Sequence, residues 1–214
     1  GSGITGGQDL TKVGAGNLSL GSSTATLGSL TISAGTLTST SGTMNLFGDY
    51  SNGGTFTNNS GTVNFNGTTQ AIGGSVSTTF NNLTVNHVTV RNIYWRGIYA
   101  SSACGSFTIA ENTVENVQGN PGYSIAIFNW QGSGYFTNNK VDNANDGIVS
   151  NWSTGTVYSG NTVTNSGSGI HTDNNGGAGG NADIIQNNLV KNSTADGWGI
   201  WVFAPYLPVL VKDN

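Results

Sequence analysis

The chain has 214 residues with six Lys and Arg against ten Asp and Glu, which gives a formal net charge of −4. So few and scattered basic residues argue against a nucleic acid as partner, because phosphate binding needs clustered Lys and Arg. No apolar run approaches the roughly 20 residues of a membrane-spanning helix. A single cysteine, Cys104, excludes an intrachain disulfide.

A short repeat of about 19 residues organises residues 1–82. The segment Gly35–Leu46 aligns with Gly54–Phe65, and one further step back reaches Gly16–Leu27. Within each copy, apolar and polar residues alternate over a few positions, which predicts half-buried strands rather than helices. Similar residues at a constant offset predict parallel strands about 4.8 Å apart, with one coil stacked on the next.

A wider repeat of about 22 to 27 residues covers residues 83–214. One column of this repeat consists of Val90, Val114, Val141, Val163 and Val190. Two residues after each valine stands an asparagine, at Asn92, Asn116, Asn143, Asn165 and Asn192. Two residues before the last four valines stand Asn112, Asn139, Asn161 and Asn188.

The asparagine columns predict a scaffold at the bends of the coil. A side-chain amide both donates and accepts hydrogen bonds, so stacked amides can bond from coil to coil. Asn also tolerates the left-handed backbone conformation that a tight bend requires. We therefore assign these asparagines no ligand role. Arg91 and Glu115 stand between the valine and the second asparagine, and we expect them to pair on a solvated face.

Repeats such as Phe136–Ile148 resemble those of right-handed parallel β-helix proteins, the pectate-lyase-like superfold. This resemblance extends over about residues 83–203, and the first half is similar to the Gly-Thr and Asn-Gly repeats of large bacterial surface proteins and adhesins. The resemblance to parallel β-helix proteins implies an all-β, single-stranded right-handed parallel β-helix of about nine coils with almost no α-helix. We expect one continuous β-solenoid over residues 1–214, with short coils in 1–82 and wider coils with loop insertions in 83–214.

Enzymatic activity is one function that the superfold implies, since it includes polysaccharide lyases and glycoside hydrolases. If the chain is such an enzyme, its candidate catalytic residues are Asp146, Asp173, Asp196 and His171, because two carboxylates at a suitable separation can perform acid–base glycoside chemistry. The Asn-Thr-Asp, Asp-Asp and Gly-His-Gly motifs of polygalacturonases are absent from the sequence, however. Asp residues that cap turns are the simpler interpretation.

Aromatic residues give a second functional signal. The residue after the isoleucine of each Gly-Ile strand points outward by alternation, and these residues are Tyr99, Val149, His171 and Trp201. Outward aromatic side chains on a polar sheet can stack on sugar rings, which present apolar C–H faces. The predicted glycan-binding residues are Tyr99, Trp152, His171, Asp173 and Trp201.

From these patterns we expect an extracellular or cell-surface structural and adhesive module, part of a surface protein or fibre, that binds a polysaccharide or cell-surface glycan. A polysaccharide lyase or glycoside hydrolase is the alternative. We expect no cofactor and no metal site, except Ca²⁺ if the chain is a lyase. Exposed strand edges at the ends of a solenoid predict head-to-tail self-association or continuation into a longer chain.

Overall fold

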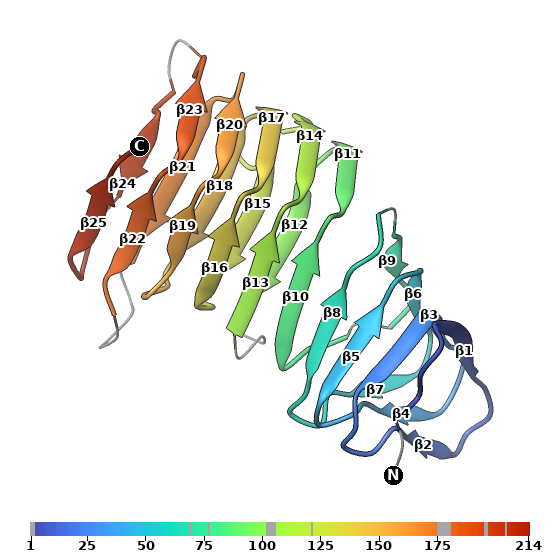
Figure 1. The fold of residues 1–214 in the computed structure, drawn as a ribbon. Coiled ribbons are helices and arrows are strands. Elements are labelled where there is room, and N and C mark those ends of the chain that lie inside the picture. Colours follow the sequence, from blue (N-terminus) through green and yellow to red (C-terminus); the bar gives the residue numbers. More distant parts are fainter. Residues whose placement is uncertain are drawn as a thin grey trace. The chain divides into compact units, whose positions relative to one another are not determined.

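The computed structural model describes residues 3–68, 70–76, 78–101, 106–120, 122–174, 181–194, 197–203 and 205–214. All regular elements in this part of the chain are β-strands. The fold is a parallel β-solenoid of about nine coils (Figure 1), which confirms the predicted all-β class. The described residues form two compact units, one from Gly3 to Val88 with Ser106, and one that contains the rest. A single continuous solenoid over 1–214 stays a prediction.

The first unit contains the short coils. Its strands are β1 (Gln8–Lys12), β2 (Asn17–Ser19), β3 (Ala25–Ile32), β4 (Thr36–Thr38), β5 (Thr43–Leu46), β6 (Tyr50–Asn52), β7 (Thr55–Thr57), β8 (Thr62–Phe65), β9 (Ile72–Gly73) and β10 (Asn82–Asn86). One face follows the order β10-β8-β5-β3-β6-β9, with β1 also paired to β3, and a second face follows β2-β4-β7. Parallel pairing holds the register that the 19-residue offset predicts, for example Met44 with Val63.

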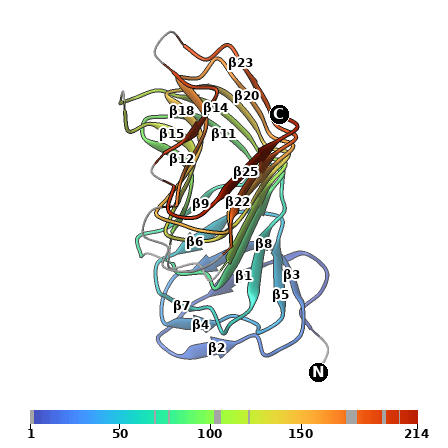
Figure 2. The ribbon, with the colours of Figure 1, turned by 90° about the vertical axis from the view of Figure 1, so that its left-hand side faces the viewer.

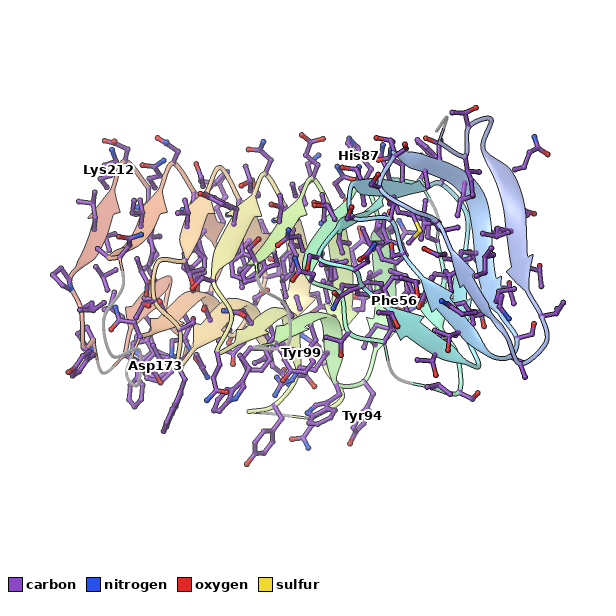
Figure 3. The ribbon with its side chains drawn as sticks, turned by 90° about the horizontal axis from the view of Figure 1, so that it is seen from below. Phe56, His87, Tyr94, Tyr99, Asp173 and Lys212 are labelled. Atoms are coloured by element: carbon purple, nitrogen blue, oxygen red, sulfur yellow. The ribbon has the colours of Figure 1, made fainter. Side chains whose placement is uncertain are left out.

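The interior of the first unit is filled by stacked apolar side chains. Leu37 pairs in register with Leu18 and with Phe56, which confirms the column expected from the repeat. Tyr50 makes edge-to-face contacts with Phe56 and Phe65, with ring centroids 6.1 and 5.8 Å apart. Figure 3 shows Phe56 inside the coils. Each coil buries little by itself, so stability comes from this stacking between coils.

The second unit has three parallel faces, whose strands lie one behind another in Figure 2. The first face contains β13 (Ser106–Ala110), β16 (Gly134–Thr137), β19 (Val157–Ser159), β22 (Asp183–Gln186) and β25 (Val209–Lys212). The second face contains β11 (Thr89–Ile93), β14 (Thr113–Val117), β17 (Lys140–Ala144), β20 (Thr162–Thr164) and β23 (Leu189–Lys191). The third face contains β12 (Arg96–Ser101), β15 (Ile125–Trp130), β18 (Asp146–Asn151), β21 (Ser168–Asp173) and β24 (Ile200–Val202).

Two asparagine ladders hold the bends of the second unit, as predicted. In the inner ladder, each side-chain amide donates to the next Oδ1 at 2.8–3.0 Å, through Asn112, Asn139, Asn161, Asn188 and Asn214. In the outer ladder, the asparagines at the bend have φ between 53° and 60°, and they are Asn92, Asn116, Asn143, Asn165 and Asn192. The ladders fix the bends on either side of the second face, and thereby the position of the third face.

Candidate functional site

Glycines determine which residues of the third face point outward. A Cβ added to Gly97, Gly147 or Gly169 would lie 2.4–2.8 Å from a valine side chain of the second face, so these glycines face the interior where no larger residue fits. The isoleucines that follow Gly147 in β18 and Gly169 in β21 are fully buried as well. Because two successive positions face inward, the residues on both sides of each Gly-Ile pair face outward.

The outward residues of the third face form three columns that follow from the strand register. The first column is Arg96, Ile125, Asp146 and Ser168. The second column is Tyr99, Phe128, Val149, His171 and Trp201. The third column is Ser101, Trp130, Asn151 and Asp173. The second column crosses five coils, a span of about 19 Å at the spacing of parallel strands.

Most residues of these columns, but not Ser101, Ser168 or Asp173, line a groove with a volume of about 440 Å³. Gly122 and Tyr123, from the loop that precedes β15, add to its lining. The complete lining, hereafter the groove, is Arg96, Tyr99, Gly122, Tyr123, Ile125, Phe128, Trp130, Asp146, Val149, Asn151, His171 and Trp201. Figure 3 shows Tyr99 pointing away from the ribbon on the side of Tyr94 and Asp173, opposite Lys212.

Aromatic rings stack along the groove from coil to coil. Tyr99 lies on Phe128 with ring centroids 5.3 Å apart and planes 12° apart. His171 lies on Trp201 at 4.4 Å, and Trp201 stacks in turn on Trp198 at 4.3 Å. Phe128 is only 6% exposed and Val149 only 1%, whereas Tyr99 is 53% exposed. The middle of the groove is therefore a small second apolar cluster, with a more exposed aromatic ring at the Tyr99 end.

Arg96 and Asp146 carry the opposite charges of the first outward column. The Arg96 guanidinium lies 4.4 Å from the centre of the Phe128 ring and donates a 2.5 Å hydrogen bond to the Tyr123 carbonyl. Burial raises the pKa of Asp146, while a hydrogen bond with Ser168 and the charge of Arg96 oppose this rise. Burial lowers the pKa of Arg96, and the nearby Tyr99 and Asp146 oppose that change. The Arg96–Tyr123 bond also fixes one rim of the groove.

His171 is a neutral imidazole in the groove at pH 7. It is 8% exposed, and burial lowers its pKa from 6.5 to about 4. Its Nε2 is buried without a hydrogen-bond partner among the described residues, and so is Oδ1 of Asn151. Buried polar atoms without partners are uncommon because each costs free energy that a hydrogen bond would offset. Both atoms belong to residues that line the same groove.

The structure brings several of the predicted site residues together. Tyr99, Asp146, His171 and Trp201 all line the groove. Trp152 is 47% exposed and stacks on the lining residue Trp130 with ring centroids 5.8 Å apart, so it lies beside the groove. Asp173 is 5% exposed and pairs in register with Asn151, outside the lining. Asp196 lies outside the described residues.

Asp146 and Asp173 are too far apart to act as a pair of catalytic carboxylates. Asp146 pairs in register with Ser168, and Asp173 is the last residue of the same strand, β21. Five residues of strand separate their Cα positions by roughly 16 Å along the sheet. Glycoside hydrolysis requires carboxyl groups about 5 to 9.5 Å apart. The strands thus place these two residues at opposite ends of the third face.

Sequence reasoning missed several residues of the groove. Arg96 occupies the same column as Asp146, and the shared Gly-Ile that follows both residues was the signal that could have identified it. Asn151 pairs with Trp130 two residues beyond the outward column and could have been found in the same way. Tyr123 belongs to a loop insertion with no counterpart in the neighbouring repeats, so no pattern in the sequence indicates its position.

A family model described as periplasmic copper-binding protein (NosD) matches residues 3–196 of this chain. No curated protein and no solved structure shows a significant match. The description contradicts the expectation that proteins of this kind have no cofactor, or only Ca²⁺, and that expectation is corrected accordingly.

The described residues do not fit a copper site. Copper in proteins is held by imidazole, thiolate and thioether ligands, several at a time. Met44, the sole methionine, is fully buried in the first unit, and His87 and His171 belong to different units. In the described part of the chain, no three His, Cys, Asp or Glu residues are grouped so as to hold a metal ion. Cys104 lies outside the described residues.

The family description also bears on location. It places its members in the periplasm, which agrees with the predicted location outside the cytoplasm but does not specify the cell surface. No helix with the length and hydropathy to cross a membrane occurs in the part of the chain that the structure describes. Because the family model matches most of the sequence and the fold is a parallel β-solenoid, the chain belongs to the NosD family.

Proposed function

We propose that this protein is a glycan-binding β-solenoid module of the periplasm or cell envelope, and that the groove on the third face of the second unit holds the glycan. The observation that carries this proposal is a pair of ring stacks in one column of the groove, Tyr99 on Phe128 and His171 on Trp201, with Val149 between them. Sugar rings present apolar C–H faces that pack on aromatic surfaces. A column about 19 Å long, with Tyr99 exposed at one end and Trp201 partly exposed at the other, suits a chain of several sugars better than one small molecule.

Further exposed aromatic residues beside the groove support an extended ligand. Tyr94, Trp95 and Tyr123 are 69%, 56% and 60% exposed, and with Asn120 they line a second hollow of about 350 Å³. Tyr123 lines both hollows. Exposed large aromatic side chains that gather in one place are typical of interaction surfaces. The chain of sugars would therefore continue past Tyr123.

The observations favour binding over cleavage at this groove. Asp146 is the one carboxylate in the lining, and its position is too far from Asp173 for a catalytic pair. Adhesion, fibre formation and head-to-tail self-association stay predictions from the repeat pattern alone.

The test is a glycan array followed by isothermal titration calorimetry with each oligosaccharide that binds. Tyr99→Ala removes an exposed ring from the groove and should weaken binding about tenfold. Tyr135→Ala is the matched control, because Tyr135 is 54% exposed, also lies in a strand of the second unit, and belongs to the first face. Equal loss of affinity in both variants, or no glycan binding by the unmodified protein, would contradict the proposal.

A further inference from the structure

The two buried polar atoms without partners indicate what kind of glycan the groove takes. His171 pairs in register with Val149, and Asn151 lies two residues further along the outward side of the same strand. Their Cα atoms are therefore about 8 Å apart, from one strand spacing and two residues of strand. Both side chains line the groove. The two atoms without partners are His171 Nε2 and Asn151 Oδ1. A single sugar unit, or two in sequence, would lie over both residues.

The hydrogen-bonding capacity of these atoms favours hydroxyl groups. Asn151 Oδ1 can only accept a hydrogen bond, so its partner must be a donor. The Nε2 atom of a neutral imidazole either donates or accepts according to its tautomer, and a hydroxyl group can match it in both cases. Carboxylate and sulfate oxygens only accept, so either group would face Asn151 Oδ1 acceptor to acceptor.

The charges of the groove lead to the same conclusion. Arg96 is the only side chain of the lining that is positively charged at pH 7, since the lowered pKa of His171 keeps its imidazole neutral. The Arg96 guanidinium donates one bond to the Tyr123 carbonyl and lies over the Phe128 ring, and the charge of Asp146 beside it compensates part of its positive charge. Recognition of an acidic sugar needs a cation that is free to pair with it.

We infer that the groove binds a neutral, hydroxyl-rich glycan and discriminates against uronates and sulfated sugars, with His171 Nε2 and Asn151 Oδ1 as the polar contacts that fix a sugar unit. Trp201, which stacks on the His171 ring, holds the imidazole so that Nε2 keeps its position in the groove. This inference rests on the proposed glycan-binding function.

The first experiment compares ligand classes on the unmodified protein. Unbranched neutral hexasaccharides of the gluco, xylo and manno series are titrated beside galacturonate and mannuronate hexasaccharides, by calorimetry at 50 and 500 mM NaCl. We expect the tightest neutral ligand to bind at least tenfold more tightly than either uronate, with an affinity that changes less than twofold with salt. Tighter binding of a uronate would overturn the inference and leave glycan binding intact. Absence of binding to every glycan would overturn the proposed function as well.

The second experiment tests the two residues with the tightest neutral ligand. His171→Phe keeps a ring on Trp201 but removes Nε2, and Asn151→Ala removes Oδ1; each should weaken binding about tenfold. Asn86→Ala is the matched control, because Asn86 Oδ1 is also buried without a partner but lies in the first unit. Circular dichroism checks that each variant folds, and His171→Leu replaces His171→Phe if it does not. Unchanged affinity in the folded variants would contradict the assignment of these residues.

Discussion

The two units stack parallel strands in the same way but close their bends with different chemistry. In the first unit, glycines supply the left-handed conformation, such as Gly14, Gly21 and Gly35 with φ of 72–75°. In the second unit, asparagines supply it, with φ of 53–60° at the outer ladder. A glycine itself contributes only backbone bonds between coils, such as Thr55 N to Gly35 O at 2.8 Å. An asparagine bend adds a continuous chain of side-chain amides.

This difference explains why the groove can form in the second unit. Its repeats vary between about 22 and 27 residues, yet the inner ladder keeps every coil in register at the bend. Loops can therefore lengthen beside the third face without shifting its strands. The loop before β15, which places Tyr123 at the groove, is one such insertion. Asparagine bends thus allow variable loops on a regular scaffold, which is how binding sites are commonly built.

Removal of one inner-ladder amide should have the largest effect on stability. Asn161 accepts from the Asn139 backbone and side chain at 3.0 Å and donates to Phe136 O and Asn188 Oδ1 at 2.9 Å. Asn161→Ala leaves these buried partners unsatisfied, which should lower the free energy of unfolding by about 3–5 kcal/mol. Urea unfolding followed by tryptophan fluorescence measures this, because Trp95, Trp130, Trp152, Trp198 and Trp201 all belong to the second unit.

The control for this variant lies in the first unit. Asn64 donates one side-chain bond, to Asn45 Oδ1 at 3.1 Å. Asn64→Ala should lower the free energy of unfolding by about 1 kcal/mol or less, measured by circular dichroism. If the two variants lose equal stability, the amide ladder does not distinguish the units.

Acid should destabilise the second unit through His171. Its folded-state pKa of about 4 lies below the ordinary 6.5, so the unfolded chain binds the proton more readily. The free energy of unfolding therefore has its full value above pH 6.5. It falls by at most about 3 kcal/mol as the pH drops toward 4. Urea unfolding at a series of pH values, followed by tryptophan fluorescence, measures this loss.

The acid effect is isolated by comparison with His171→Phe. The raised pKa values of Asp146 and Asp183 act in the opposite direction, because the folded state holds those protons more tightly. They are common to both proteins, so the difference between the two stability curves reports His171. A difference that stays constant between pH 7 and pH 4 would show that the imidazole is not desolvated.

Glycine bends of the first unit should differ in sensitivity according to the space around them. Gly35 and Gly14 have nearly the same φ, but a Cβ on Gly35 would lie 2.3 Å from Gly14 O, whereas a Cβ on Gly14 meets nothing within 4 Å. Gly35→Ala should cost about 2–3 kcal/mol through both strain and steric overlap. Gly14→Ala should cost about 1 kcal/mol through the backbone conformation alone. Circular dichroism during urea unfolding compares them, and equal losses would mean that φ alone limits this bend.

The sequence predicts the scaffold well and the groove only in part. The valine and asparagine columns follow from a repeat that can be aligned by eye, because stacking imposes the same residue at the same bend in each coil. His171 is predicted to point outward, and it does lie in an outward column. Its burial could not be predicted, since it depends on Trp201 and on other outward side chains from neighbouring coils. Asn214 also extends the inner ladder, and no repeat pattern in the sequence indicates its place there.

The smallest effect should come from the charges on the second face. Arg91 Nε lies 2.8 Å from Glu115 Oε2, which confirms the predicted pairing, but the two side chains are 60% and 33% exposed. Arg91→Gln should therefore change the free energy of unfolding by about 0.5 kcal/mol or less at low salt, and by nothing measurable in 1 M NaCl. Urea unfolding of both proteins at the two salt concentrations measures this change. A loss above about 2 kcal/mol that persists in salt would mean that surface charge, and not the buried amides, stabilises the wide coils. If the effect is as small as we expect, the difference between the two units lies in their bends and not in surface charge.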